Sequence, residues 1–206
     1  MTRVYDILNI LRTFIEPRCE LNYRNSYELL IAVVLSAQTT DKHVNQITIP
    51  LFEKYDDVYK LSKADVLSIK EIIKPLGLAD VKSRNISNLA KIIVEKYNGI
   101  VPNTFDDLIN LPGVGRKTAQ VVLAEGFKIP ALPVDTHVER VSKRLGLVKE
   151  KDSVVDVELN LKKIIKREDW ILSHHLLLLF GRYYCKKASP MCENCKLKEY
   201  CKDIIK

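Results

Sequence analysis

The chain has 206 residues, and 47% hydrophobic residues with only seven glycines and eight prolines exclude disordered, collagen-like and low-complexity proteins. No apolar run approaches the roughly 18 residues that span a bilayer, and charges interrupt the apolar N-terminus, so we expect an intracellular protein without signal peptide or membrane contact. Lys and Arg number 33 against 26 acidic residues, with most of the excess in residues 103–206 (19 basic, 14 acidic). This excess suggests a polyanionic partner there, although a solvated Lys-rich surface is the more common case on charge alone.

The first elements in chain order follow the helical period. Apolar residues at positions 4, 7, 8, 11 and 15 predict an amphipathic helix. Residues 27–38 are almost wholly apolar, which predicts a helix buried on all sides, with Ser26 as its N-cap. Thr40 or Asp41 caps the next helix, and Pro50 should break or kink it because proline lacks the amide and clashes with the preceding turn.

Further helices follow. Ser62, with Asp65 three residues later, predicts a helix start of the capping-box type, and this helix ends near residues 75–77. The next helical pattern covers residues 82–97 and ends at Asn98–Gly99. Thr104 with Asp107 opens a short helix, which the sequence LPGVG interrupts.

The last third of the chain predicts two or three more helices after Pro130 and Pro133, through residue 177. No stretch alternates apolar and polar residues over the length of a strand. The sequence therefore predicts an all-α fold of about ten short helices. A change of composition near residues 130–133 marks the only expected boundary between two lobes.

Two of the glycines, Gly113 and Gly115, lie between helical segments in residues 108–127. Glycine permits positive φ and puts no side chain between its amide and an approaching group. The amides of Val114 and Gly115 and the start of the following helix could then point outward together and bind a backbone phosphate without recognising base sequence. A plain tight turn between two helices is the alternative.

Lys117 and Asp135 are the candidate reactive pair. Lys117 lies in the first turn of the helix after the glycines, where the helix dipole and Arg116 disfavour a charged ammonium. A neutral amine is a nucleophile able to form a Schiff base, although a solvated surface lysine is the more common case. Asp135 stands 18 residues later at the start of a helical pattern, where it can be an N-cap or can return to the side of the hairpin.

Four of the five cysteines lie close together near the C-terminus: Cys185, Cys192, Cys195 and Cys201. In an intracellular chain a disulfide framework is disfavoured, and four thiolates suit either a tetrahedral zinc ion or a [4Fe–4S] cluster. The spacing alone favours iron–sulfur only slightly. Cys19 has no partner in this scheme.

At this point the residues resemble a known family. LPGVGRKTA followed by VDTH is similar to the endonuclease III branch of the helix–hairpin–helix DNA glycosylases. LSAQTTD at 35–41, the pair Gly77–Leu78 and the terminal cysteines match the same branch in the same order, so the resemblance covers about residues 20–203. Ala79 departs from it, since an aromatic residue often follows the Gly–Leu pair.

The resemblance implies two lobes and a chemistry. Residues 19–129 would form a six-helix barrel containing the helix–hairpin–helix motif at about 108–127, and residues 1–18 with 130–206 would form an iron–sulfur lobe. Lys117 would attack C1′ of a flipped nucleotide in duplex DNA, expel an oxidised pyrimidine and then cleave the abasic site by β-elimination. Asp135 on the other wall of a cleft would help deprotonate the lysine and stabilise the cationic sugar.

The resemblance also implies further site residues. Gln38 and Leu78 would fill the hole that the flipped base leaves. Gly113, Val114, Gly115 and His137 would contact the DNA backbone. The four terminal cysteines would hold a structural [4Fe–4S] cluster, so that Lys186 and Lys187 in the loop between the first two cysteines contact phosphates. We expect a monomer in the cytoplasm or at the nucleoid.

Two alternatives remain open. A monofunctional mismatch glycosylase shares this fold but lacks the lysine found here at position 117, and the adenine-removing branch adds a catalytic Glu that LSAQ does not carry and a large C-terminal domain. A non-catalytic helix–hairpin–helix DNA-binding module would suit the basic charge and the hairpin equally well. That module leaves the co-occurrence of Lys117 and Asp135 unexplained.

Overall fold

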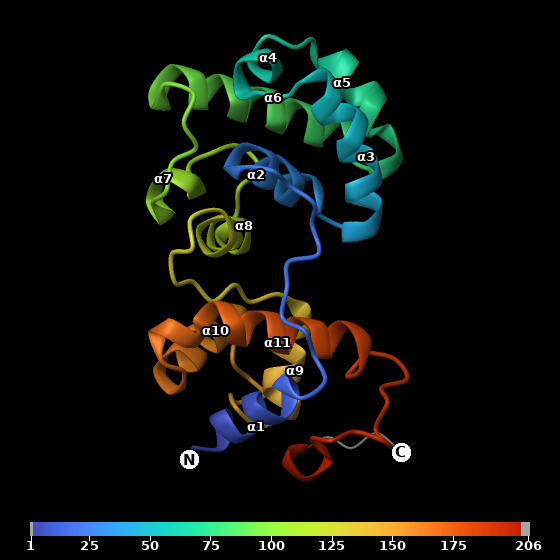
Figure 1. Cartoon of the computed structure of the whole chain (residues 1–206), viewed down its shortest axis with the longest axis vertical. Coiled ribbons are helices and arrows are strands. Elements are labelled where there is room, and N and C mark those ends of the chain that lie inside the picture. The colour runs from blue at the N-terminus through green and yellow to red at the C-terminus, as the bar shows by residue number, and fades with distance from the viewer. Residues whose placement is uncertain (1, 203–206) are drawn as a thin grey trace. The chain divides into compact units, whose positions relative to one another are not determined.

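The structure is a computed structural model that describes residues 2–202. These residues form eleven α-helices, with short 3-10 or π-helical turns between some of them, and no strand (Figure 1), which confirms the predicted all-α class. None of these helices is both long and apolar enough to cross a membrane. The chain divides into two compact units, Cys19–Ile129 and Met1–Arg18 with Pro130–Lys206.

The unit Cys19–Ile129 contains seven of the α-helices. They are α2 (Ser26–Leu35), α3 (Asp41–Lys54), α4 (Val58–Ser62), α5 (Val66–Ile73), α6 (Ala79–Tyr97), α7 (Phe105–Ile109) and α8 (Arg116–Val121). A 3-10 turn (Lys74–Leu76) follows α5, and a π-helical segment (Val122–Gly126) continues α8. The long helix α6 packs against α4 and α5 (Figure 1).

Helix α2 is the centre of this unit. Its residues 27–35 are all buried, as the unbroken apolar pattern predicts, and it contacts α3, α6 and α8. A helix with no polar face gains stability only where neighbours cover it on every side. Packing against α2 therefore fixes the positions of the neighbouring helices, and with them the residues at the ends of those helices.

Three of the predicted helix boundaries are wrong in detail. Asn25, and not Ser26, caps α2, because its side chain accepts from the Glu28 amide at 2.9 Å. Ser62 ends α4, and Asp65 is itself the N-cap of α5. Pro50 lies inside α3 without ending it, since a single missing amide close to the C-terminal turn leaves most of the helical hydrogen bonds intact, so the predicted break is wrong and the kink stays a prediction.

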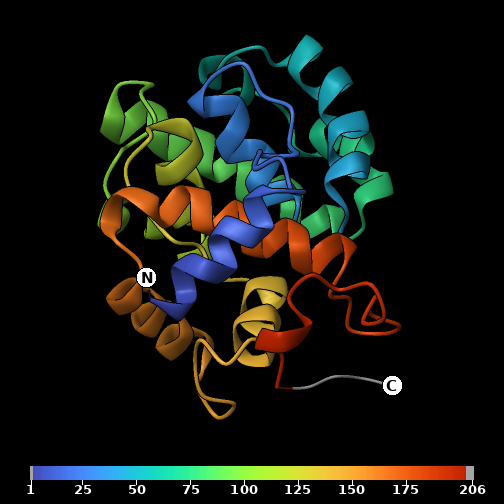
Figure 2. The same ribbon diagram turned by 60° about the horizontal axis from the view of Figure 1, so that its bottom comes forward.

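The unit of residues 1–18 and 130–206 contains α1 (Arg3–Arg12), α9 (Thr136–Arg144), α10 (Val154–Ile164) and α11 (Trp170–Tyr183). Short 3-10 turns at Arg167–Asp169 and Lys198–Tyr200 precede and follow α11. Helix α11 packs against α9 and α1 (Figure 2). The predicted apolar face of the first helix is buried here, through Val4, Ile7, Leu8 and Leu11.

Candidate active site and nucleic-acid interface

The first candidate region is the hairpin between α7 and α8. Gly113 has φ +77°, a conformation that favours glycine. A Cβ on Gly113 would lie 3.0 Å from the Asn85 side chain and 3.1 Å from that of Val34, so the hairpin is packed closely on α6 and α2. By contrast, a Cβ on Gly115 would meet nothing within 4 Å, so this side of the hairpin is open to an approaching group.

The hairpin amides correct one expectation. The Val114 amide donates to the Leu111 carbonyl at 3.1 Å, within the turn itself. It is therefore not the outward-pointing donor that the sequence predicted, because closing the turn uses that amide. Gly115 is the residue before α8, and its own amide makes no such bond among residues 2–202. The open donor position thus begins at Gly115, one residue later than expected.

Lys117 is the second residue of α8, and its side chain is exposed. No hydrogen bond or ion pair joins it to any other residue that the structure describes. Its neighbour Arg116 is held elsewhere, because the guanidinium lies 5.2 Å from the centre of the Phe105 ring on α7. The Lys117 amine thus remains accessible to an incoming electrophile.

Asp135 is the N-cap of α9, as the sequence allowed. Its Oδ1 accepts from the amides of His137 and Val138, both at 2.9 Å. Two backbone amides at a helix N-terminus hold the carboxylate in one orientation. The structure gives Oδ2 no partner among residues 2–202, so one oxygen anchors the side chain and the other is available for chemistry.

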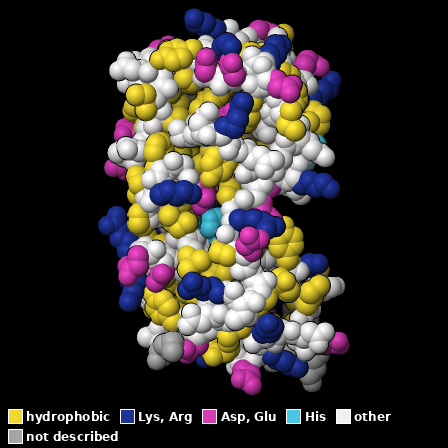
Figure 3. Space-filling view, viewed as in Figure 1, with side chains coloured by type: hydrophobic (Ala, Val, Ile, Leu, Met, Phe, Trp, Pro, Cys, Tyr) yellow, Lys and Arg dark blue, Asp and Glu magenta, His cyan; other side chains and the backbone are white. Residues whose placement is uncertain are grey.

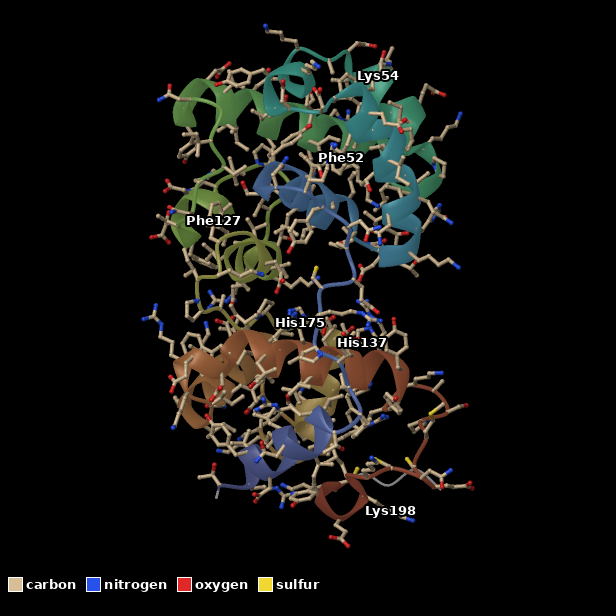
Figure 4. The ribbon with its side chains drawn as sticks, viewed as in Figure 1. Phe52, Lys54, Phe127, His137, His175 and Lys198 are labelled. Atoms are coloured by element: carbon tan, nitrogen blue, oxygen red, sulfur yellow. The ribbon has the colours of Figure 1, made fainter. Side chains whose placement is uncertain are left out.

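Helix α9 is tightly bound to α11 behind Asp135. A Cβ on Gly181 of α11 would lie 2.9 Å from the His137 Cβ and 3.0 Å from the His137 carbonyl oxygen, so only glycine permits this approach. Arg140 lies beside it, with Nη2 donating to the Gly181 carbonyl at 2.7 Å and 3.2 Å from His137 Nδ1. His137 itself, labelled on α9 in Figure 4, is half-buried. These contacts fix the helix that orients Asp135.

Gln38 and Leu78 share an unusual backbone conformation. Gln38 has φ +58° and Leu78 has φ +53°, and both side chains are exposed. A non-glycine residue in the left-handed region costs of order 1–3 kcal/mol and persists only where its surroundings enforce it. Gln38 follows the end of α2, and Leu78 precedes α6, which are the two helices that Gly113 touches. The structure therefore places both residues and the hairpin on one helical framework.

The four C-terminal cysteines line one cavity of about 380 Å³. None of the four forms a disulfide. Burial raises the pKa of the Cys195 thiol, a backbone hydrogen bond with Leu197 partly offsets this, and the other three cysteines raise the pKa further. Four cysteines around a single cavity are a donor set suited to a metal centre.

The lining of the cavity does not by itself separate a zinc ion from an iron–sulfur cluster, because four thiolates suit either. In residues 2–202 no three His, Cys, Asp or Glu side chains come together closely enough to hold one metal ion. Basic side chains also line the cavity, from Arg144, Lys196 and Lys198 (the last labelled in Figure 4), and they would offset the negative charge of four thiolates.

Lys186 and Lys187 are exposed in the loop after Cys185. Arg144 anchors the start of this loop, because Nη1 donates to the Lys186 carbonyl at 2.8 Å and lies 3.4 Å from Cys185 Sγ. On the face of the molecule in Figure 3, Asp and Glu side chains lie among the Lys and Arg side chains. That face therefore shows no large patch made of basic side chains alone.

Arg140 and Arg144 are functional-site residues that the sequence did not single out. Both lie on α9, four residues apart, and both bond the cysteine segment, Arg140 through the Cys185 carbonyl at 3.1 Å. The signal was present, since an i, i+4 pair of arginines after Asp135 occupies one face of the predicted helix. The spacing of the two arginines could not show which residues they bond, because those residues lie 41 or more positions away along the chain.

Comparisons with known proteins identify the family of this chain. Residues 31–167 match the HhH-GPD superfamily base excision DNA repair protein family. Endonuclease III of Bacillus subtilis is 48% identical over 190 residues, covering 92% of this chain and 87% of the relative. Endonuclease III of Escherichia coli is 41% identical over 185 residues, covering 90% and 87%.

Solved structures give the same result. One described as a non-covalent Endonuclease III–DNA complex is 47% identical, with a TM-score of 0.94, over 98% of this chain and 96% of that one. A thermostable thymine-DNA glycosylase is 26% identical, with a TM-score of 0.78, over 97% and 93%. The chain therefore belongs to the HhH-GPD superfamily of base excision DNA repair proteins, in its endonuclease III branch.

Proposed function

We propose that this chain is a bifunctional base-excision enzyme, which removes oxidised pyrimidines from duplex DNA and then cleaves the resulting abasic site through a Schiff base on Lys117. The observation that carries the proposal is the exposed, unpaired Lys117 amine at the start of α8, directly after the open side of the hairpin. A relative of 47% identity over 98% of this chain is described as a trapped Endonuclease III–DNA covalent intermediate. A covalent intermediate requires a protein nucleophile, and Lys117 is the candidate.

The reaction divides into two steps. The neutral Lys117 amine attacks C1′ of the damaged nucleotide, the bond from C1′ to the base breaks, and the base leaves with a proton. The bond from C1′ to O4′ then breaks and the sugar ring opens, with O4′ taking the second proton of the amine, which gives an imine between Nζ and C1′ and a hydroxyl on C4′. The imine, protonated on Nζ, accepts the electron pair left when C2′ loses a proton; the pair returns to expel the 3′ phosphate, and water releases the enzyme by hydrolysing the imine.

Asp135 supplies the negative charge that this chemistry needs. The charge on the sugar becomes positive as the base departs, and a fixed carboxylate stabilises it without reorganisation. Because the His137 and Val138 amides hold Oδ1, Oδ2 is the oxygen that would accept the lysine proton and face the sugar. The proposal requires that Asp135 and Lys117, which belong to different units, act on the same nucleotide.

The remaining site residues bind and distort the DNA. A base can be attacked at C1′ only after leaving the stack, which takes a few kcal/mol. Gln38 would hydrogen-bond the widowed base, and Leu78 would support the stack as an apolar wedge. The Gly113–Gly115 hairpin, His137, Lys186 and Lys187 would hold backbone phosphates, with Gly115 in place of Val114 as the first open amide.

A [4Fe–4S] cluster is the cofactor that the cysteine cavity would hold, through Cys185, Cys192, Cys195 and Cys201. When bound, this cluster contributes redox-active iron and cross-links the segment in which Lys186 and Lys187 lie. Arg144 would donate a hydrogen bond to the first thiolate from α9. The bond-breaking steps above use protein side chains alone.

The direct test is borohydride trapping on a duplex that carries one thymine glycol. We expect wild type and Lys91→Gln to form a covalent protein–DNA adduct, and Lys117→Gln to form none. Lys91 is a matched control, because it is an exposed lysine on α6 outside the proposed site.

The other outcomes separate the alternatives. Trapping of the wild type on a preformed abasic site but not on thymine glycol would retain the lyase and reject the oxidised pyrimidine. Base release without any adduct would favour a monofunctional glycosylase. Tight binding without either product would favour the non-catalytic DNA-binding module.

A further inference from the structure

The turn before α6 holds two consecutive residues at positive φ, Gly77 at +69° and Leu78 at +53°. Leu78 is 55% exposed, so burial of its side chain does not stabilise this conformation. A Cβ on Gly77 would meet nothing within 4 Å, so no neighbouring element supports the turn from that side. The conformation must therefore be enforced through the backbone on either side of the two residues.

On the C-terminal side of the turn, hydrogen bonds to α6 hold the backbone of Leu78 in place. The Leu78 carbonyl accepts from the amides of Val81 and Lys82, at 3.1 and 3.0 Å. On the other side the Gly77 amide makes only a long bond of 3.4 Å to the Lys74 carbonyl. The Leu76 carbonyl is instead bound by a side chain, since Lys82 Nζ donates to it at 3.1 Å.

Lys82 is an unexpected residue at this place. Its side chain is 4% exposed, and it lies in the first turn of α6, where the helix dipole disfavours a positive charge. Burial lowers the pKa of the Lys82 ammonium. The Leu76 carbonyl is its only acceptor among residues 2–202. An apolar side chain of the same length would fill the space without this desolvation, so the hydrogen bond is the property that only the lysine provides.

We propose that Lys82 is a positioning residue for the step that distorts the DNA. By holding the Leu76 carbonyl, Lys82 keeps Leu78 in its exposed left-handed conformation. This proposal rests on the proposed function, in which Leu78 is the wedge. Lys82 touches neither DNA nor the reacting atoms, because it is buried behind the turn. It acts by joining the segment before the turn to the helix after it.

The test is a double-mutant cycle on single-turnover excision of thymine glycol at saturating protein. Lys82→Met keeps the length and volume of the side chain and removes the donor. We expect it to slow excision about 10- to 100-fold, the scale on which misplacement by about 1 Å acts. The midpoint of urea unfolding should be unchanged or higher, because a buried ammonium has been removed. Affinity for undamaged duplex should be unchanged, since the phosphate contacts are elsewhere.

The cycle adds two variants and a control. Leu78→Ala should slow excision, and Leu78→Ala with Lys82→Met should be no slower than Leu78→Ala alone, because the clamp acts only through the wedge. Lys82→Arg should restore part of the rate, since a guanidinium can donate to the same carbonyl. Lys91→Met, on the exposed side of α6, should match wild type.

A base analogue gives an independent readout. 2-Aminopurine beside the lesion should brighten when wild type unstacks the duplex, and much less with Lys82→Met. The proposal would be overturned if Lys82→Met excised thymine glycol as fast as wild type. It would also be overturned if the effects of Leu78→Ala and Lys82→Met on the excision rate multiplied in the double variant. If Lys82→Met does not fold, Lys82→Gln, whose shorter amide loses the reach, takes its place in the cycle. Failure of the wild type to excise or trap would instead reject the function on which the proposal rests.

Discussion

At the scale of single residues, the site separates side chains that hold the structure from side chains left available for reaction. Asp135 does both, since Oδ1 is bound by two amides and Oδ2 by none of the described groups. The Lys117 side chain is available for reaction but holds no other residue, because nothing in residues 2–202 bonds its amine. Substitutions can therefore separate the two roles.

Asp135→Asn should abolish base excision while leaving stability nearly unchanged. Asparagine is as good an N-cap as aspartate, so the bonds to the His137 and Val138 amides survive, but the negative charge that stabilises the sugar cation is lost. Asp135→Ala should lose activity and also about 0.5–2 kcal/mol of stability with the cap. Urea denaturation and single-turnover excision measure the two effects. Full activity of Asp135→Asn would show that the aspartate is a plain cap.

The two hairpin glycines should behave oppositely. Gly113→Ala places a Cβ 3.0–3.1 Å from Asn85 and Val34 at φ +77°, so it should destabilise the chain by about 1–3 kcal/mol. Gly115→Ala has open space and negative φ, so the fold should be unaffected. Its methyl group would nevertheless obstruct an approaching phosphate, and DNA affinity should fall. Thermal unfolding and fluorescence anisotropy with duplex DNA distinguish these outcomes; equal stability of both variants would contradict the packing described here.

At the scale of elements, helix ends carry the candidate site residues, and close contacts between helices hold those ends. Gln38 follows α2, Leu78 precedes α6, Lys117 opens α8 and Asp135 opens α9. The contact between α9 and α11 is the closest of these supports, because His137 lies directly over Gly181. Changing one helix should thus disturb the chemistry of another.

Gly181→Ala should move α9 away from α11. The added Cβ would meet the His137 backbone oxygen at 3.0 Å, and a backbone atom gives way only if the helix shifts. Overpacking of this kind costs about 1–3 kcal/mol, partly offset by the better helix propensity of alanine. Excision should fall because Asp135 moves with α9. Hydrogen exchange of α9 amides reports the shift, and Gly115→Ala is the matched control for stability. Unchanged exchange in α9 would count against this coupling.

At the scale of the whole molecule, the net charge of +7 and the cysteine cavity each join residues from distant parts of the chain. On the face drawn in Figure 3, acidic side chains lie among the lysines and arginines. Affinity for DNA should then depend on a limited number of phosphate contacts at particular loops.

Salt dependence measures those contacts. Each phosphate neutralised contributes about 0.9 to the slope of log affinity against log salt concentration. Replacing Lys186 and Lys187 together by Gln should reduce the slope by about 1.8. Replacing Lys91 and Lys96, two exposed lysines of α6, changes the net charge equally and should leave the slope as in wild type. Equal slopes for all three proteins would remove the loop after Cys185 from the interface.

Removing one cysteine of the proposed cluster site should prevent the cluster from binding. Cys195→Ser should lose iron and acid-labile sulfide, and it should loosen α9, because Arg140 and Arg144 both bond Cys185 from that helix. Cys19→Ser is the control, since Cys19 lies in the other unit and outside the cavity. Metal analysis and visible absorption measure the iron and sulfide content, and hydrogen exchange measures the opening of α9. Zinc in place of iron in the purified wild type would reject the cluster.

The local features of this protein follow from the sequence. The period of apolar residues determines the all-α class, and comparison with relatives confirms the family that LPGVGRKTA and VDTH indicated. The caps at Thr40, Thr104 and Asp135 are correct, because an N-cap bonds amides two or three residues away and so depends on adjacent sequence. The Ser26 and Ser62 caps fail by one and three positions, where a second polar residue competes for the same role.

Tertiary structure alone decided which residues support the site. Lys82 and Gly181 looked ordinary in the sequence, and their importance lies in a clamped carbonyl and in a helix that passes within van der Waals distance. The bonds from Arg140 and Arg144 to the cysteine segment likewise join residues more than 40 positions apart. Such contacts leave no local pattern, because packing brings them together only after the helices have formed. The sequence thus determined the helices and the candidate chemistry, while the packing of those helices determined how each reactive group is held.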